Sequence, residues 1–245
     1  MTKKVVLITG ASGGIGSSIA KIYHDNGYFV VGMSRSEPDA NYVDKNYAID
    51  LNRLVEDADY FKSWSETYVQ EIGRLDVLIN NSATQILAPV DELTHKAWQK
   101  TLNVNLSAPF VLSKFFVPML EKEKGCIINI GSIHATQTKP RFVAYATSKA
   151  GLVGLTQALA IDLRDRVRIN CISPAAVETE MLKAGFKDDE AGYKLLESYH
   201  PINRIGQPEE IAELCLFLSS DKCRFLTGTN IEVDGGISKR LYDPN

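Results

Sequence analysis

The sequence predicts an α/β fold: a doubly wound parallel sheet of seven strands with helices on both faces. Short runs rich in Val, Ile and Leu alternate with longer helical patterns along the chain, which is typical of parallel sheets. A glycine-rich turn lies between the first of these runs and the first helical pattern, as in phosphate-binding βα units. The chain has 245 residues, of which 44% are hydrophobic, so it can bury one substantial core. We therefore expect a single domain over residues 1–245.

The glycine-rich turn predicts a dinucleotide site. Residues 5–8 form the first predicted strand, and they lead into Thr9-Gly10-Ala11-Ser12-Gly13-Gly14-Ile15-Gly16, after which residues 17–26 favour a helix. Glycines let the backbone approach a pyrophosphate, whose charge then meets N–H groups at the helix N-terminus. An ordinary glycine-rich turn is the alternative interpretation. The glycines stand at 10, 14 and 16, which indicates a variant of the GxGxxG fingerprint.

The second predicted strand, residues 28–33, ends at Ser34-Arg35-Ser36, and this end bears on the choice of cofactor. A carboxylate here would accept from the adenosine ribose and repel a 2′-phosphate, whereas Arg offers that phosphate a forked donor. Ser34 and Arg35 supply no acid and one cation. The sequence therefore favours NADP(H), with NAD(H) as the alternative, unless Arg35 is only a solvated surface charge.

Polar residues follow the next strands. Residues 47–50 are predicted as the third strand, with Asp50 and Leu51 at its end, where Asp50 could accept from the adenine amino group. A helical region over 54–72 precedes the fourth strand, residues 76–80, which runs into Asn81. Residues 98–121 contain two helical patterns with Asn103 and Asn105 between them.

A Tyr/Lys pair follows the fifth strand, residues 126–131, which ends at Ser132. Residues 143–163 predict a long helix that carries Tyr145 and Lys149. Because these residues are four positions apart, a helix places their side chains on one face, with Cβ atoms about 5–6 Å apart. An adjacent ammonium lowers the pKa of a phenol, so we expect the pair to donate and accept protons near neutrality. The spacing alone is weak evidence for catalysis, because most Tyr/Lys pairs of this kind lie on solvated helix faces.

The C-terminal part continues the alternation. Residues 166–172 predict the sixth strand, 208–219 a helix that opens with Pro and two acids, and 229–233 the seventh strand. Between them, residues 180–205 are polar and irregular in pattern, which predicts a mobile substrate lid.

Composition excludes several functional classes. The net charge of −3 and the absence of a Lys/Arg cluster argue against nucleic acid or an anionic membrane as partner. Residues 1–4 are followed by only four apolar residues, 5–8, and this run is too short for a signal peptide or a membrane span. We therefore expect a cytoplasmic protein. The four cysteines have no CxxC spacing and indicate reduced structural thiols. The four histidines are scattered; we expect them at the surface and expect no metal site.

These motifs together resemble the short-chain dehydrogenase/reductase family, over essentially the whole chain. The loop of residues 9–16 is similar to its cofactor loop, residues 80–83 to its NNAG motif and residues 174–179 to its PGxxxT motif. Its catalytic tetrad corresponds to Asn105, Ser132, Tyr145 and Lys149. The end of the chain, from His200 to Gly236, resembles the family's 3-oxoacyl-carrier-protein reductases and sugar or polyol dehydrogenases.

The resemblance implies a Rossmann-type fold and hydride transfer between nicotinamide C4 and a carbonyl or secondary alcohol. Tyr145 would be the general acid or base, Lys149 would lower its pKa and bind the nicotinamide ribose, and Ser132 would hydrogen-bond the substrate oxygen. Asn105 would anchor a water, and Val177 and Thr179 would hold the carboxamide. The expected cofactor contacts are Gly10, Ser12, Gly13, Gly14, Ile15, Gly16, Ser34, Arg35, Asp50, Leu51, Asn81, Tyr145, Lys149, Val177 and Thr179.

Two departures from the family pattern concern the backbone. Ser82-Ala83 replaces Ala-Gly, and Ala175 replaces the Gly after Pro174. If the family backbone needs a positive φ at either place, we expect Ala to be strained there.

The substrate is expected to be small and polar, because polar residues fall near the predicted site. Gln85, Gln137 and Tyr199 could line the pocket, and the expected substrate contacts are Ser132, His134, Arg141 and Tyr145. The apolar helix with Phe110, Phe115 and Phe116 and the small-faced helix after Tyr145 predict a helix-pair dimer. In the family, such dimers usually pair into homotetramers.

Two other functions are consistent with parts of the sequence. A serine hydrolase could use Ser132 with His134, but the GxSxG motif is missing. A catalytically silent NADP(H)-binding scaffold or redox sensor is the more serious alternative.

Overall fold

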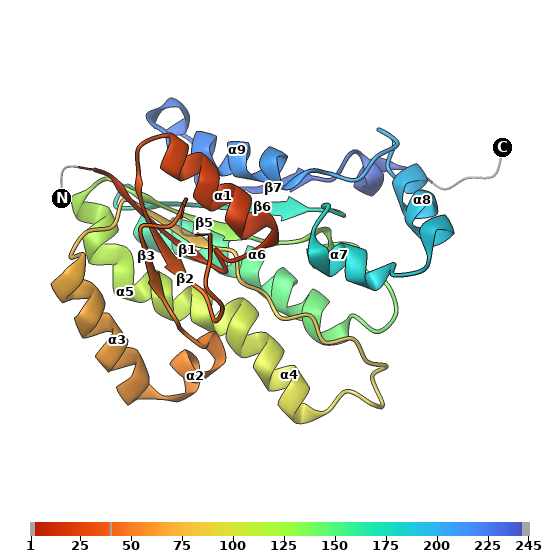
Figure 1. Ribbon diagram of the computed structural model, residues 1–245, viewed down its shortest axis with the longest axis horizontal. Helices are drawn as coiled ribbons and strands as arrows, with labels where there is room; N and C mark the ends of the chain where they lie inside the picture. Colours follow the sequence, from red (N-terminus) through yellow and green to blue (C-terminus); the bar gives the residue numbers. More distant parts are fainter. Residues whose placement is uncertain (1–2, 40, 242–245) are drawn as a thin grey trace.

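The molecule is built on a seven-stranded parallel sheet with strand order β3-β2-β1-β4-β5-β6-β7 (Figure 1). It was obtained as a computed structural model, and it describes residues 3–39 and 41–241. This order confirms the predicted doubly wound sheet. The strands are β1 (Val5–Thr9), β2 (Phe29–Met33), β3 (Lys45–Tyr47), β4 (Val77–Asn80), β5 (Cys126–Ile130), β6 (Arg168–Pro174) and β7 (Asn230–Val233).

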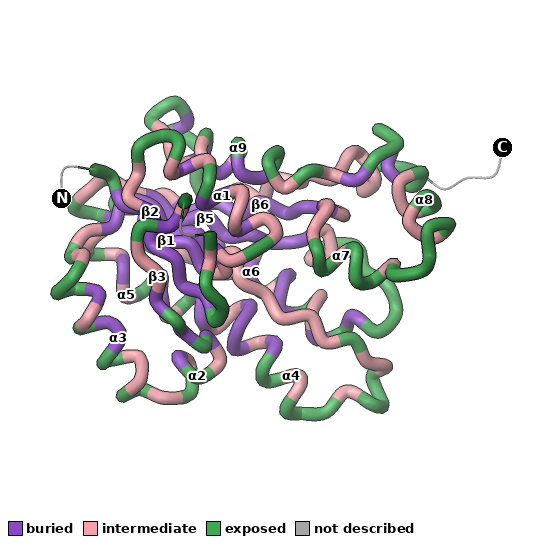
Figure 2. The backbone as a smooth tube through the Cα atoms, in the orientation of Figure 1, coloured by how far each residue is buried: buried purple, intermediate pink, exposed green. Residues whose placement is uncertain are grey.

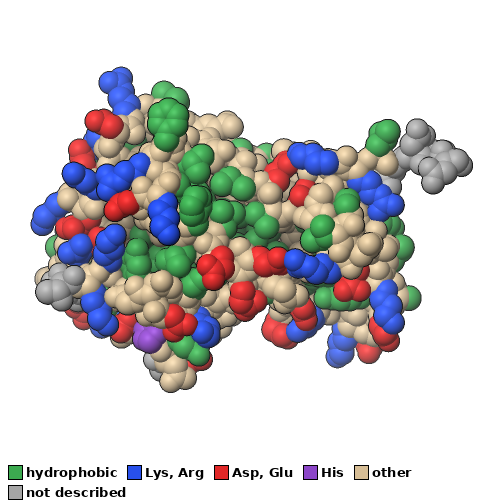
Figure 3. All heavy atoms as spheres, turned by 90° about the horizontal axis from the view of Figure 1, so that it is seen from above, with side chains coloured by type: hydrophobic (Ala, Val, Ile, Leu, Met, Phe, Trp, Pro, Cys, Tyr) green, Lys and Arg blue, Asp and Glu red, His purple; other side chains and the backbone are tan. Residues whose placement is uncertain are grey.

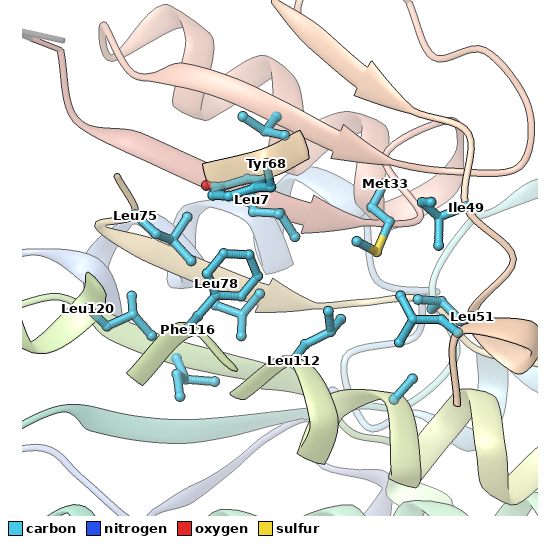
Figure 4. Packing of buried hydrophobic residues seen from close by; sticks show 14 of the residues in the cluster. Leu7, Met33, Ile49, Leu51, Tyr68, Leu75, Leu78, Leu112, Phe116 and Leu120 are labelled. Carbon is cyan, nitrogen blue, oxygen red and sulfur yellow. The ribbon is translucent and has the colours of Figure 1, made fainter. Parts of the chain in front are cut away.

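Helices cover both faces of the sheet because neighbouring residues of a strand point to opposite sides. On one face, Ile8 and Ile79 pack against α1 (Gly14–Asp25) and α9 (Pro208–Ser219). On the other, Leu7 and Leu78 pack against α3 (Ala58–Glu71), α5 (Ala108–Lys122) and α6 (Val143–Leu163). Figure 4 shows Leu7 and Leu78 close to Phe116, and Figure 2 shows that the strands are buried along most of their length. The predicted bounds of α6 and α9 are confirmed.

A buried chain of amide groups ties α6 to the sheet. Asn80 of β4 donates through Nδ2 to Asn129 Oδ1 of β5, at 2.8 Å. Asn129 in turn donates through Nδ2 to Thr156 Oγ1 of α6, at 2.9 Å. Because an unpaired polar group in a core costs free energy, this network fixes how α6 sits on the sheet, and with it the helix that carries Tyr145.

The predicted third and sixth strands are displaced. The third strand, predicted over 47–50, is β3 at Lys45–Tyr47, because Asp50 caps the next helix, α2 (Leu51–Glu56), and does not extend the strand. The Asp50 Oδ1 accepts from the backbone N–H groups of Asn52 and Arg53. The sixth strand begins at Arg168 and extends to Pro174, and Arg166 precedes it and pairs with Glu121.

Two irregular segments have defined structure. Between α4 (His95–Leu102) and α5, residues Asn103–Ser107 form a π-helical turn. Residues 180–205, which are irregular in sequence pattern, contain α7 (Glu180–Gly185) and α8 (Glu190–Tyr199). Their expected role as a mobile lid stays a prediction. Each of these helices begins at a capping side chain, Thr179 for α7 and Asp189 for α8. The sequence pattern that could have predicted both helices is a Thr or Asp at the residue before the helix, whose side chain accepts from the backbone N–H three positions later.

Two further findings concern composition. All four cysteines are buried free thiols. Within residues 3–39 and 41–241, no helix is both long and apolar enough to cross a membrane.

Candidate active site

The carboxyl ends of β1, β2, β4, β5 and β6 border one cavity of about 900 Å³. The sheet order reverses between β1 and β4, and such a reversal is where open α/β sheets bind ligands. Every expected cofactor contact except Gly16 lines this cavity. The expected cofactor contacts, taken from separate parts of the sequence, therefore lie around one cavity.

The glycine loop has the shape that a phosphate group needs. Gly10 and Gly14 have φ of +72° and +52°, a region that favours glycine. A Cβ on Gly16 would lie 2.0 Å from the Gly10 carbonyl oxygen, so Gly16 lets α1 pack against the loop instead of lining the cavity. A Cβ on Gly13 would meet nothing within 4 Å. The first turn of α1 thus opens into the cavity, and its N–H groups fit a pyrophosphate.

Asn81 holds this loop in place from the neighbouring strand. Its Nδ2 donates to the backbone oxygens of Thr9 and Gly10 at 3.0 and 3.2 Å. Thr9 Oγ1 accepts from the backbone N–H groups of Asn81 and Ser82, each at 2.9 Å. The asparagine therefore supports the glycine loop and lines the cavity as well.

The end of β2 supplies a hydroxyl and a cation. Ser34 is buried, and its Oγ has no hydrogen-bond partner among the described residues. Arg35 is exposed and lines the cavity beside it. A buried hydroxyl without a partner is costly unless a ligand or water satisfies it. These two residues, with Asp50 across the cavity mouth, fit the adenosine half of a dinucleotide.

Ser132 and Tyr145 meet at the end of β5. Ser132 Oγ caps the short turn that follows, accepting from the His134 backbone N–H at 3.2 Å. The Ser132 hydroxyl also acts to lower the pKa of the Tyr145 phenol. Burial acts more strongly in the other direction, so the pKa of Tyr145 lies above its usual value near 10. The expected lowering of this pKa is therefore not observed.

The reason lies in the position of Lys149. Its side chain is 2% exposed, and Nζ donates to the Ile130 backbone oxygen at 2.6 Å. The same Nζ lies 5.7 Å from the centroid of the Tyr145 ring. Burial lowers the pKa of Lys149 from 10.5 to about 8. The two groups share one helix face, as the spacing predicted, but the ammonium bonds to β5 and not to the phenol.

Asn105 lies behind the cavity and does not line it. It is buried in the π-helical turn, where Oδ1 accepts from the Thr84 N–H at 2.7 Å. Its Nδ2 donates to the Thr84 oxygen at 3.0 Å and to Ser148 Oγ at 2.9 Å. The structure thus shows Asn105 joining the β4 loop to α6, next to the Tyr/Lys face. The water that it was expected to anchor stays a prediction.

The PGxxxT-like segment closes the cavity opposite the glycine loop. Val177 is buried and Thr179 caps α7, and a Cβ on Gly14 would lie 3.2 Å from Thr179 Cγ2. None of Ser82, Ala83 and Ala175 has a positive φ. The two departures from the family pattern therefore cause no backbone strain.

The expected substrate residues divide into two groups. Gln85, His134, Gln137 and Tyr199 line the cavity together with Ser132 and Tyr145. Arg141 does not line it: its φ is +74°, its side chain is exposed, and its backbone oxygen accepts from Ala88. The structure therefore does not bring Arg141 into the site.

Several lining residues were not predicted. His200 is 2% exposed, with Nδ1 at 2.9 Å from the Leu196 oxygen, so the expectation that all histidines lie at the surface was wrong. Lys139, Phe142 and Ile237 also line the cavity. Lys139 and Phe142 lie between Ser132 and Tyr145 in the sequence, and that position could have suggested them. Within the described residues, no three His, Cys, Asp or Glu side chains gather as a metal site would.

Comparison with known proteins agrees with this geometry. A family model described as Enoyl-(Acyl carrier protein) reductase matches residues 10–238. The 3-oxoacyl-[acyl-carrier-protein] reductase FabG of Thermotoga maritima is 34% identical over 242 residues, covering 96% of this chain and 97% of that protein. Human dehydrogenase/reductase SDR family member 4 is 32% identical over 262 residues, covering 98% of this chain and 90% of that protein.

Solved structures share the fold over nearly the full length. Ligand-free Thermoplasma acidophilum aldohexose dehydrogenase superposes with a TM-score of 0.92 at 31% identity, covering 99% of this chain and 97% of that one. ElxO with NADP bound superposes with a TM-score of 0.87 at 27% identity. For 4-hydroxyisoleucine dehydrogenase complexed with NADH, the TM-score is 0.89 at 29% identity. In both cases 98% of this chain and 100% of the other are covered.

The chain belongs to the short-chain dehydrogenase/reductase family. It is an NAD(P)-dependent oxidoreductase that acts on CH–OH groups.

Proposed function

We propose that this protein is an NADP(H)-dependent oxidoreductase whose substrate is a small, polar carbonyl compound or the matching secondary alcohol. The observation that carries the proposal is the meeting of Ser132, Tyr145 and Lys149 beside the glycine loop in one cavity. When bound there, the nicotinamide supplies or accepts the hydride. The side chains described below supply the proton and position the substrate.

Tyr145 is the general acid of the reduction and the base of the reverse reaction. Burial raises the pKa of this phenol, so the side chain stays protonated at neutral pH and has a proton to donate. Ser132, which lines the cavity with Tyr145, also donates to the substrate oxygen as negative charge develops on it. Lys149 stabilises the phenolate that remains, because its ammonium lies 5.7 Å from the ring. Asn105 positions α6 through Ser148 and anchors the water through which Lys149 exchanges protons.

Arg35 and Ser34 support the preference for NADP(H) over NAD(H). The end of β2 carries no acid that would repel a 2′-phosphate, while the Arg35 guanidinium and the unpartnered Ser34 hydroxyl can both donate to one. ElxO, a relative of this chain, binds NADP, while 4-hydroxyisoleucine dehydrogenase was complexed with NADH.

The segment of α7 and α8 acts as a lid, and the protein acts as a homo-oligomer in the cytoplasm. Phe116 is fully buried in the core and is not available to the expected dimer interface, whereas Phe115 packs against the core and is partly buried. Phe110 of α5 and Ile161 of α6 are 44% and 79% exposed and support a helix-pair contact. The face that carries α9 exposes further hydrophobic side chains (Figure 3). Phe217 of α9 is among the exposed hydrophobic residues. Two separate apolar faces fit a tetramer, which sedimentation velocity can test.

The test of the proposed function is a Tyr145→Phe variant. It keeps the ring contacts, so it should bind NADPH as the parent does, measured by nicotinamide fluorescence, while reduction of a panel of polar ketones falls at least about 100-fold. Tyr193→Phe removes a hydroxyl from α8 outside the cavity and should keep its turnover. If Tyr145→Phe retains most of its turnover, Tyr145 is not the acid.

A further inference from the structure

The substrate end of the cavity carries positive charge that no carboxylate of the described residues matches. Residues from segments 82–87 and 132–149 line this end, and neither segment contains Asp or Glu. Residues of α7, α8 and Ile237 line the cavity as well. Lys139 and Lys149 supply two cations to the lining there. Among residues 3–39 and 41–241, the lining has two acids, Asp50 at the adenosine end and Glu180 on α7. The Glu180 side chain is 91% exposed and lies 3.8 Å from Lys183, so its charge is turned to solvent.

Lys139 is the cation at this end that the fold does not use. Its Nζ lies over the Phe142 ring, 4.9 Å from the centroid, and it forms no ion pair with any residue in 3–39 or 41–241. Lys149, by contrast, is committed to the Ile130 oxygen. An ammonium over an aromatic face keeps a defined position while its other hydrogens stay available to a ligand.

His134 connects Lys139 to the reacting end of the site. Its ring stacks on Phe142 at 4.4 Å and meets Tyr145 edge-on at 5.8 Å. Nδ1 lies 3.2 Å from Thr138 Oγ1. Burial, and then the charge of Lys139, lower the pKa of His134 to about 4, so the imidazole is neutral at neutral pH. It can therefore hydrogen-bond a ligand without adding charge, and the charge comes from Lys139.

We propose that Lys139 and His134 form an anion subsite, and that the substrate is an oxo acid or hydroxy acid whose carboxylate is attached to the reacting carbon or lies a few carbons from it. This inference rests on the proposed function, because it places the reacting carbon beside Tyr145. A carboxylate fits better than a phosphate, since one ammonium and one neutral imidazole match a single negative charge, whereas phosphate sites gather more cations or backbone N–H groups.

The subsite is tested by binding, with short oxo acids and their neutral esters as probes. Pyruvate and levulinate are titrated into the complex with NADP⁺, where no hydride can be transferred to them, and methyl pyruvate and methyl levulinate serve as matched neutral ketones. The readouts are the dissociation constants and the NMR titration of the His134 ring. At least one acid should bind about tenfold more tightly than its ester and should raise the pKa of His134, because a nearby anion offsets the charge of Lys139.

Variants assign the effect to Lys139. Lys139→Gln should abolish the preference for the acid, and Lys139→Arg should restore most of it. Lys96→Gln removes an exposed charge of α4 outside the cavity and should change nothing. If neither acid binds more tightly than its ester, or if Lys139→Gln keeps the preference, the anion subsite is refuted. NADPH binding, measured first by fluorescence, separates the two proposals: a protein that binds no dinucleotide refutes the proposed function itself.

Discussion

The burial of Lys149 predicts that the proposed active site costs stability, and a Lys149→Met variant measures that cost. One pKa unit corresponds to about 1.4 kcal/mol, so a fall from 10.5 to about 8 destabilises the folded state by about 3 kcal/mol below pH 8. Methionine has a similar length and no charge. The substitution also leaves the Ile130 backbone oxygen without its donor, which lowers the stability of the folded state by about 1 kcal/mol. At about pH 7 the variant should therefore be about 2 kcal/mol more stable than the parent protein.

The sign of the pH dependence follows from the same shift. Between about pH 8 and 10.5 the unfolded state binds more protons at Lys149 than the folded state does, so the stability of the parent protein rises with pH. At about pH 9.5 the penalty has fallen to about 1 kcal/mol, and the two proteins should be nearly equal in stability. Other titrating groups contribute to both proteins alike and cancel in the difference.

Urea unfolding of both proteins at the two pH values, followed by far-UV circular dichroism, gives the two differences in the free energy of unfolding. Turnover should be lost in Lys149→Met at both pH values. A variant less stable than the parent protein at about pH 7, or a difference that does not change with pH, would refute the reasoning from burial.

Two further predictions concern the cofactor end of the site. Arg35→Asp should weaken NADPH binding at least about tenfold in fluorescence titrations and leave NADH binding within about threefold, since the new carboxylate repels only the 2′-phosphate; equal loss for both cofactors would contradict the role of Arg35. Gly16→Ala should lower the melting temperature and abolish dinucleotide binding, because its Cβ would lie 2.0 Å from the Gly10 oxygen, whereas Gly13→Ala, with open space around its Cβ, should keep the parent's melting temperature. Equal melting temperatures for the two alanine variants would contradict this account of the loop.

The order of strands and helices was predictable because its causes are local. Buried parallel strands appear as continuous apolar runs, and α9 begins with a proline and two acids. The boundaries of β3 and β6 were less predictable. Ala48 and Ile49 suit a strand as well as a loop, and the choice is made by the Asp50 side chain, which caps α2. Such a competition between a strand end and a cap is decided by tertiary context.

Residues of the site were predictable where their type and local backbone geometry indicate a single role. Glycines with positive φ, Ser132 at a strand end, and Tyr145 and Lys149 on one helix face all follow from local geometry. The electrostatics of the Tyr/Lys pair were not predictable, because they depend on the burial of Lys149 and on its bond to Ile130, nineteen residues away in sequence. Arg141 and Lys139 are two residues apart, and only the fold decides which of the two lines the cavity.

The most direct test of the central claim follows the hydride itself. NADPH carrying deuterium at nicotinamide C4 is incubated with the parent protein and a panel of polar ketones, and the products are analysed by mass spectrometry. The account predicts that deuterium appears on the carbinol carbon of at least one product with the parent protein, and that Tyr145→Phe binds the same NADPH but transfers almost none. Alcohol products without deuterium, or equal transfer by the two proteins, would contradict it.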